Sequence, residues 1–150
     1  MTRLPDMQLR EAIAHQIDLL AQGRPLVAFD AWFSPAGKMY ANDRLFAADG
    51  AEARRKQEPF ISAAREICGK ITDLKVDAAK GLCVFRNQTR FSGADGAEHQ
   101  IDGLCWQRWE GGQIAEERYY DGALMDVCIG EGVLEDPAQL LLRAPGAMPG

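Results

Sequence analysis

The sequence predicts an α+β fold in which helices come first and an antiparallel sheet follows. Apolar residues spaced by three or four occupy the first part of the chain, whereas strand-like alternation begins near residue 70. Short turns containing glycine separate the strand-like segments, so consecutive strands should pair antiparallel. Runs of helix followed by runs of strand are typical of α+β rather than α/β proteins.

Three helical segments are expected before residue 70. The first carries an apolar stripe on one face, and Pro25 fits the first turn of the second. Asp49 can cap the third, which Pro59 should kink or restart because proline removes a backbone donor. The expected helices cover 7–22, 25–33 and 50–68, with a turn at 34–37 and a short strand at 38–42.

Four longer strands are expected afterwards, over 71–77, 82–91, 98–109 and 113–121. Asp95-Gly96 and Gly111-Gly112 supply the two hairpin turns. Residues 1–130 should form one domain. Residues 131–150 are expected to be a C-terminal extension with one short helical turn, from Asp136-Pro137, and a loose end.

Composition limits the classes of function. The 150 residues carry a net charge of −5 and no dense basic patch, so nucleic acid is not an expected partner. No apolar run approaches the ~20 residues that span a bilayer, and no secretory signal is visible, so we expect no membrane contact and a cytoplasmic location. Four cysteines without a C-x-x-C pair, and two histidines, predict neither a metal site nor a cofactor.

Strand alternation divides the candidate residues between two faces of the sheet. On the strand over 98–109, Gln100, Asp102, Leu104 and Trp106 share one face, and the neighbouring residues share the other. On the next strand, Glu117 and Tyr119 share a face. Polar and apolar residues mix on both faces, which suits a sheet with a cavity on one side and a partner on the other; the pattern leaves open which is which.

Asp102 is the first candidate for chemistry. A carboxylate is uncommon in mid-strand, and a buried one needs hydrogen-bond donors or a raised pKa. A carboxyl group with a raised pKa can act as a general acid or base. The alternative is a structural Asp102, held by a neighbouring arginine or tyrosine or exposed on the sheet.

The segment Trp106–Asp121, with an aromatic strand, a Gly-Gly turn and the pattern Glu117-Arg118-Tyr119-Tyr120-Asp121, resembles the nuclear-transport-factor-2-like superfamily. It is most similar to the last hairpin of the polyketide-cyclase-like (SnoaL-like) branch. The resemblance covers residues 5–125 and implies a cone: a strongly curved, mostly antiparallel sheet wrapped around the N-terminal helices. It also implies a cavity at one end and a homodimer through the outer sheet face.

The epoxide hydrolase branch of this superfamily allows a residue-level comparison. Tyr40 and Asn42 match its early-strand element, and Asp102 matches its middle-strand carboxylate. Gln100 stands where that branch has arginine, and Tyr119 where it has the water-activating aspartate, so Glu117 would have to substitute. A ketosteroid-isomerase-like combination of Tyr40, Asp102 and either Asp30 or Glu117 is a looser match.

Aromatic residues complete the set of candidates. Tyr119, Trp106, Trp32 and Phe29 are candidates for substrate contact, although packing in the core or in a dimer also explains Trp106.

Three hypotheses therefore stand. The first is a cofactor-free enzyme that performs isomerisation, hydration or cyclisation on a small apolar molecule, with Asp102, Tyr40 and Asn42 as catalytic residues. In it, Glu117, Tyr119 and Gln100 contact the substrate. The second is a binding module for a small ligand or a partner protein, and the third is a dimeric accessory domain.

Overall fold

The computed structural model describes residues 4–143. The helices are α1 (Leu4–Ala21), α2 (Pro25–Trp32), α3 (Gly50–Ala63) and α4 (Gly122–Gly130), followed by a 3-10 helix, η1 (Pro137–Leu142). The strands are β1 (Phe33–Ala41), β2 (Arg44–Ala47), β3 (Arg65–Cys68), β4 (Ile71–Asp77), β5 (Leu82–Ser92), β6 (Glu98–Glu110) and β7 (Gln113–Tyr120).

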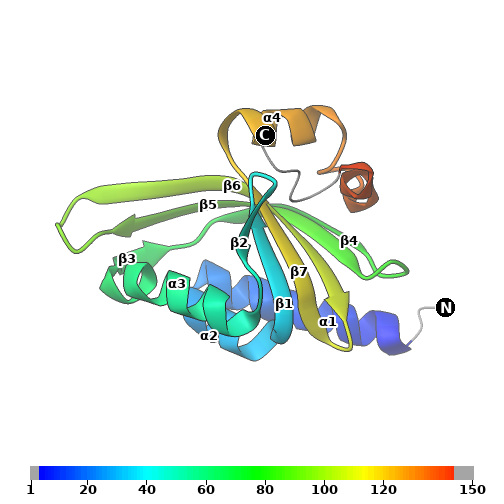
Figure 1. Cartoon of the computed structure of the whole chain (residues 1–150), viewed down its shortest axis with the longest axis horizontal. Coiled ribbons are helices and arrows are strands. Elements are labelled where there is room, and N and C mark those ends of the chain that lie inside the picture. The colour runs from blue at the N-terminus through cyan, green and yellow to red at the C-terminus, as the bar shows by residue number, and fades with distance from the viewer. Residues whose placement is uncertain (1–3, 144–150) are drawn as a thin grey trace.

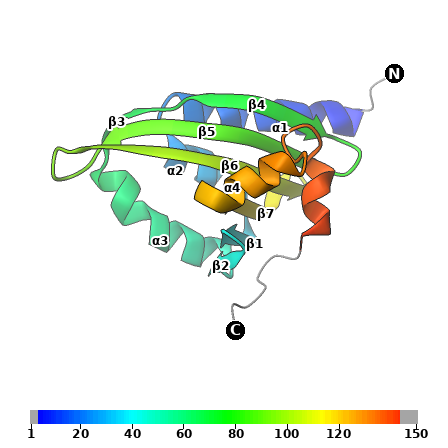
Figure 2. The ribbon, with the colours of Figure 1, turned by 90° about the horizontal axis from the view of Figure 1, so that it is seen from above.

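The strands form one curved, unclosed sheet with the order β2-β1-β7-β6-β5-β3, and β4 also pairs with β5. Every pair is antiparallel except β1 with β7. Helices α1, α2 and α3 lie against one face, and α4 and η1 lie against the other (Figures 1 and 2). The predicted α+β class, with a curved and mostly antiparallel sheet around the N-terminal helices, is confirmed.

The first hydrophobic core fills the space between the sheet and the N-terminal helices. Ile13 of α1 and Ala53 of α3 meet Cys83 and Phe85 of β5 and Trp109 of β6 there. The stripe expected on the first helix therefore faces the sheet. Asp49 caps α3 as expected, because its carboxylate accepts a hydrogen bond from the Glu52 amide at 2.8 Å.

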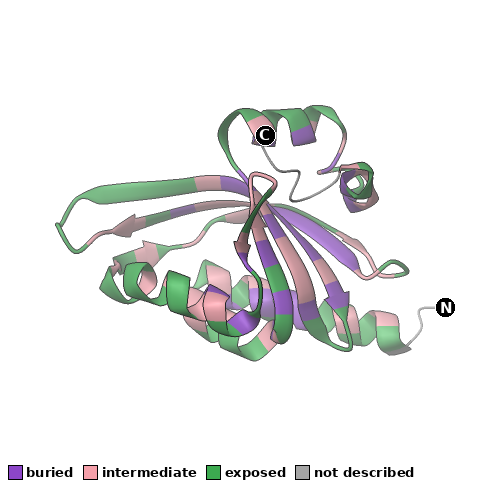
Figure 3. Cartoon of the chain, in the orientation of Figure 1, coloured by how far each residue is buried: buried purple, intermediate pink, exposed green. Residues whose placement is uncertain are grey.

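A second core lies on the opposite face of the sheet. Trp106 and Tyr120 are fully buried against Met125 of α4, and Val133 and Leu140 of the C-terminal extension pack beside them. The Trp106 indole also donates a hydrogen bond to the Pro137 carbonyl at 2.8 Å. Figure 3 shows buried residues along the middle of the sheet, whereas the far end of β6 is exposed.

Charged side chains fasten the extension at its end. Asp43, in the β1–β2 turn, accepts hydrogen bonds from the Tyr120 hydroxyl at 2.5 Å and from Arg143 at 2.6 Å. Arg118, which is buried, donates to the carbonyls of Leu140 and Arg143 and lies over the Trp106 ring. These charge-assisted bonds join the β1–β2 turn, the sheet and η1 into one unit.

Several local predictions are wrong. Residues 34–37 belong to β1 instead of a turn, and α3 does not restart at Pro59 but continues through it. The loss of one hydrogen bond is tolerated there because Glu58, Pro59 and Phe60 are exposed. The helix expected up to residue 68 ends at Ala63, and β3 pairs with the edge of β5 instead.

The other elements follow expectation more closely. The four predicted long strands correspond to β4, β5, β6 and β7, and one helical turn follows Asp136. Helix α4 was not predicted. The division at residue 130 stays a prediction, and the loose end expected over 144–150 lies outside the described residues. Within residues 4–143, no helix is long and apolar enough to cross a membrane.

Leu140 and Leu142 give a matched test of the extension. Leu140 is 1% exposed in the second core, whereas Leu142, two residues later in the same turn, is 83% exposed. We expect Leu140→Ala to lower the free energy of unfolding by about 2–5 kcal/mol, because it leaves a cavity. We expect Leu142→Ala to change it by at most about 0.5 kcal/mol. Urea denaturation measures both values, and similar effects of the two substitutions would contradict the packing of η1.

Candidate functional site

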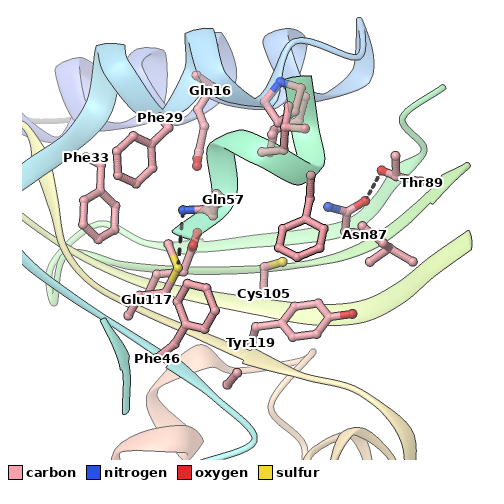
Figure 4. Close-up of a pocket in the computed structure, with 18 of the residues that line it drawn as sticks. Gln16, Phe29, Phe33, Phe46, Gln57, Asn87, Thr89, Cys105, Glu117 and Tyr119 are labelled. Carbon is pink, nitrogen blue, oxygen red and sulfur yellow. Dashed lines mark hydrogen bonds between the residues drawn. The ribbon is translucent and has the colours of Figure 1, made fainter. Parts of the chain in front are cut away.

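A cavity of about 480 Å³ lies between the concave face of the sheet and the N-terminal helices. Strands β1, β5, β6 and β7 form its floor, and α1, α2 and α3 form its roof (Figure 4). Its size is within the range of small-molecule sites in proteins.

The walls of the cavity are mostly apolar. Phe60, which is 78% exposed, and Ile101, which is 38% exposed, lie where the cavity meets solvent. Aromatic walls come from Phe29, Phe33, Phe46, Phe85 and Phe91, and polar groups come from Gln16, Tyr40, Gln57, Asn87, Thr89, Cys105, Glu117 and Tyr119.

Glu117 is the one acidic side chain among the described residues that line the cavity, and none of those residues is basic. It lies on β7 between Met39 of β1 and Gln107 of β6. Burial raises the pKa of Glu117 above its usual value, and the hydrogen bond from Gln107 opposes this rise in pKa only in part. A carboxyl group in this setting can both hold and release a proton nearer to neutral pH.

Gln107 supports Glu117 from behind the cavity wall. Its side-chain nitrogen donates to Glu117 Oε1 at 2.7 Å and to Gln16 Oε1 at 2.6 Å. Its oxygen accepts from Gln16 Nε2 at 3.0 Å, from the Trp109 indole at 3.1 Å and from Cys83 Sγ at 3.3 Å. Because Gln107 is fully buried, these bonds satisfy a polar group that would otherwise be costly to bury.

Tyr119 lies flat against the sheet over Gly103. A Cβ atom built on Gly103 would be 2.1 Å from Cε2 and 2.5 Å from the hydroxyl oxygen of Tyr119. Only glycine leaves room for the ring in this position. Burial, reinforced by the negative charge of Asp121, raises the pKa of Tyr119 above its usual range, so the phenol stays protonated and remains a hydrogen-bond donor.

Asn87 and Thr89 form a second polar group on the β5 wall. The Thr89 hydroxyl donates to Asn87 Oδ1, which fixes the amide so that its nitrogen points into the cavity (Figure 4). Cys105 lies near both Asn87 and Glu117. Burial raises the pKa of the Cys105 thiol well above its ordinary value, so it stays neutral.

The structure brings four of the candidates from the sequence to the cavity. Phe29, Tyr40, Glu117 and Tyr119 all line it. The face of β6 that contains Gly103, Cys105 and Gln107 is therefore the inner face. The predicted division of this strand into two faces, with Asp102 and Trp106 on the other one, is confirmed.

Asp102 lies on the outer face, away from the cavity. Its carboxylate makes two hydrogen bonds with Arg86, both at 3.1 Å, and its side chain is 39% exposed. The pKa of Asp102 is lowered, mainly by the hydrogen bond from Arg86, which is opposite to the raised pKa expected of an acid or base. The expectation that Asp102 works beside Tyr40 is therefore corrected, because the register of β6 turns it outward.

Five further candidates also lie outside the cavity. Gln100 is exposed on the outer face, and Trp106 is buried in the second core. Asn42 fastens a turn: its side chain donates to Asp121 Oδ1 at 2.8 Å and accepts from the Asp121 amide at 3.0 Å. Trp32 packs against Trp109 and donates to His15 at 3.0 Å. Asp30 is paired with Arg54.

Gln16, Gln57, Asn87, Thr89 and Cys105 were not identified from the sequence as cavity residues. Strand alternation could have identified some of them: Cys105 shares a face of β6 with Gln107, and Asn87 shares a face of β5 with Thr89. No such pattern exists for Gln16, since a glutamine on a helix is usually exposed. Over residues 4–143, no group of three or more His, Cys, Asp or Glu side chains is placed to hold a metal ion.

Comparison with known proteins identifies the fold. No protein-family model and no curated protein matches the sequence. Solved structures do match. A protein from Mesorhizobium loti named a SnoaL-like polyketide cyclase aligns over 75% of this chain and 97% of its own, with a TM-score of 0.61 and 19% identity. The fold is NTF2-like.

Two other structures extend this likeness. A protein from Jannaschia sp. CCS1, also named SnoaL-like, aligns over 99% of both chains with a TM-score of 0.63 and 11% identity. The epoxide hydrolase/cyclase-like enzyme SalBIII, described in pyran ring formation in the polyether salinomycin, covers 79% of this chain and 94% of its own, with a TM-score of 0.60 and 13% identity. The suspected resemblance to SnoaL-like proteins is thus confirmed at the level of fold.

The raised pKa of Glu117 predicts how stability depends on pH. Below the ordinary glutamate pKa of 4.5, Glu117 is protonated in both the folded and the unfolded chain. As the pH rises, the unfolded chain loses this proton first, so the contribution of Glu117 to stability is lost as the pH passes the folded-state pKa.

We therefore expect Glu117→Gln to gain stability relative to the original protein as the pH rises from acidic to neutral. Denaturant unfolding of both proteins at a series of pH values measures the difference. A difference that is constant, or that changes in the opposite direction, would contradict the burial of Glu117.

Gly103 offers a test of the Tyr119 position. We expect Gly103→Ala to cost about 1–3 kcal/mol of stability, because the new methyl group displaces the Tyr119 ring. Gly130→Ala is the control, since no atom of the described residues lies within 4 Å of its added Cβ, and it should be neutral or stabilise by up to about 1 kcal/mol. In the background of Tyr119→Ala, the Gly103 substitution should lose most of its cost. If Gly103→Ala costs as much stability in the Tyr119→Ala protein as in the original, the added methyl group does not clash with the Tyr119 ring.

Proposed function

We propose that the protein is a cofactor-free enzyme that uses Glu117 to transfer a proton on a small, neutral, largely apolar molecule bound in the cavity. The observation that carries the proposal is a carboxyl group with a raised pKa, on the wall of an apolar cavity, with no basic side chain beside it among residues 4–143. Isomerisation, hydration and cyclisation are the reactions that such a group serves.

The lining also supports a choice of substrate. A ligand carboxylate or phosphate would find no cation among the described residues of the wall, so its burial would be costly. A neutral molecule with a carbonyl or ether oxygen fits better, since Tyr119 and Asn87 present hydrogen-bond donors.

These groups suggest a division of roles. Ionised Glu117 removes a proton from carbon or from a hydroxyl group, and the electron pair moves toward the substrate oxygen. Donors from Tyr119 and Asn87 stabilise the charge that develops on that oxygen. The carboxyl group then returns its proton at another atom, which regenerates the starting form. Tyr40 and Phe29 orient the substrate.

The alternative is a binding module that holds such a molecule without reaction. The fold supports either reading, because one fold hosts many functions, although SalBIII offers an example of a cyclase-like enzyme on it.

A homodimer through the outer sheet face stays part of the proposal. It would use the strip of Arg86, Gln88, Arg90, Gln100 and Asp102, since α4 and η1 occupy the rest of that face. A cytoplasmic location also stays a prediction.

Proton transfer at carbon can be tested without knowledge of the natural substrate. Small neutral ketones such as β-tetralone and 2-cyclohexenone are incubated with the protein in D₂O, and NMR follows deuterium uptake beside the carbonyl. We expect catalysed exchange, and a fall of roughly 10²–10⁴-fold in its rate in Glu117→Gln, the range for loss of a general acid–base group.

Asp102→Asn is the matched control. It removes a carboxylate from the same sheet, but on the outer face, so exchange should continue at the original rate. Exchange that survives in Glu117→Gln, or that fails in Asp102→Asn, would contradict the assignment. Binding of the ketones without exchange would favour the binding module.

A further inference from the structure

Gln16 and Gln107 form a reciprocal pair of side-chain amides next to Glu117. Each nitrogen donates to the oxygen of the other amide, at 3.0 Å and 2.6 Å, and both side chains are buried. Such a pair has two equivalent arrangements: if both amides rotate by half a turn, both bonds reform with nitrogen and oxygen exchanged. The pair alone therefore cannot determine which end of Gln107 faces Glu117.

The Trp109 indole breaks this equivalence. Its N–H lies 3.1 Å from Gln107 Oε1, and an indole nitrogen can only donate. The Cys83 thiol, a weaker donor, lies 3.3 Å from the same oxygen. A rotated Gln107 would turn its own N–H groups toward these donors and its oxygen toward the Glu117 carboxylate, so three unfavourable contacts would replace three hydrogen bonds.

We infer that Trp109 is a positioning residue, whose indole N–H holds the Gln107 amide in the orientation that donates to Glu117. The inference deepens the proposed function and rests on the role given to Glu117 there. Both hydrogens of the Gln107 amide are committed, one to Gln16 and one to Glu117 Oε1. Over the described residues, the structure records no protein donor to Glu117 Oε2, so this oxygen is available to a ligand.

The described surroundings of Glu117 add no competing charge. Cys83 on β5 and Cys105 on β6 are the nearby titratable groups, and burial raises the pKa of the Cys83 thiol to about 12 and that of Cys105 well above its ordinary value. Tyr40 and Tyr119 line the same cavity from β1 and β7, while α1 and α3 contribute the neutral amides of Gln16 and Gln57. The orientation of Gln107 is therefore the main polar influence on Glu117.

The three tryptophans allow a test in the unaltered protein. Their indole N–H groups donate to different acceptors: Trp109 to Gln107, Trp106 to the Pro137 carbonyl, and Trp32 to His15. In a pH titration followed by ¹H–¹⁵N NMR, we expect the Trp109 indole signal to move with a midpoint above the ordinary glutamate pKa. That movement should vanish in Glu117→Gln, the Trp106 signal should stay still, and any movement of Trp32 should persist in Glu117→Gln.

Trp109→Phe is the corresponding variant. Without the indole donor, Gln107 can rotate and present its oxygen, which favours the protonated form of Glu117. The titration midpoint of Glu117, read from its ¹³C side-chain carboxyl signal, should rise by roughly one pH unit. This is the shift that corresponds to the free energy of one hydrogen bond to a charged group. Trp32→Phe is the control: it removes an indole whose donor bonds to His15, and it should leave that midpoint unchanged.

An unchanged Glu117 midpoint in Trp109→Phe, or a Trp109 indole signal that ignores the titration of Glu117, would overturn the inference. If Trp109→Phe does not fold, the titration of the original protein decides alone. These signals need no substrate, so they separate the inference from the proposed function. Absent ketone exchange with a shifted midpoint would reject only the proposed function, and exchange with an unchanged midpoint would reject only the inference.

Discussion

The burial of the Glu117 carboxyl group, without a basic partner in the described part of the chain, is the constraint on which the site depends. An ionised carboxylate in an apolar wall is costly unless donors surround it, and among the described residues Gln107 is its one donor. That donor needs the layer behind it: Gln16 from α1, Trp109 from β6 and Cys83 from β5. A site supported in this way is built into the sheet and the first helix instead of a loop, which favours a fixed geometry.

The sheet separates this site from the second core on its outer face. Inside, the first core ends at the cavity, whereas outside Trp106, Tyr120 and Leu140 are buried together in the second core. Arg118 and Arg143 anchor the C-terminal segment over that face. This explains why polar and apolar residues mix on both faces. The polar residues inside surround the cavity, and those outside hold the extension or, as with Asp102 and Arg86, pair with each other across strands.

The sequence predicted the class of fold, the first helices and the long strands, because hydrophobic periodicity and turn residues are local signals. It could not predict which face is inner. If the pairing continued unbroken from the Gly111-Gly112 turn, Gln107 would lie opposite Glu116. A bulge between Arg108 and Trp109 shifts the register by one residue, so Gln107 lies opposite Glu117, and Glu117 reaches the cavity.

The parallel pairing of β1 with β7 and the short helix α4 are likewise fixed by tertiary contacts. Asp102 was overvalued because a cross-strand arginine explains a mid-strand carboxylate equally well.

Titration of the glutamate side chains by ¹³C NMR tests most directly whether Glu117 is a buried acid–base group. Selective labelling of the side-chain carboxyl carbons gives one signal for each glutamate, and Glu117→Gln assigns the signal of interest. We expect that signal to titrate above the ordinary glutamate range and to move when β-tetralone fills the cavity. A Glu117 signal that titrates at the ordinary pKa of an exposed glutamate, and that ignores the ketone, would contradict both its burial and its place in a ligand site.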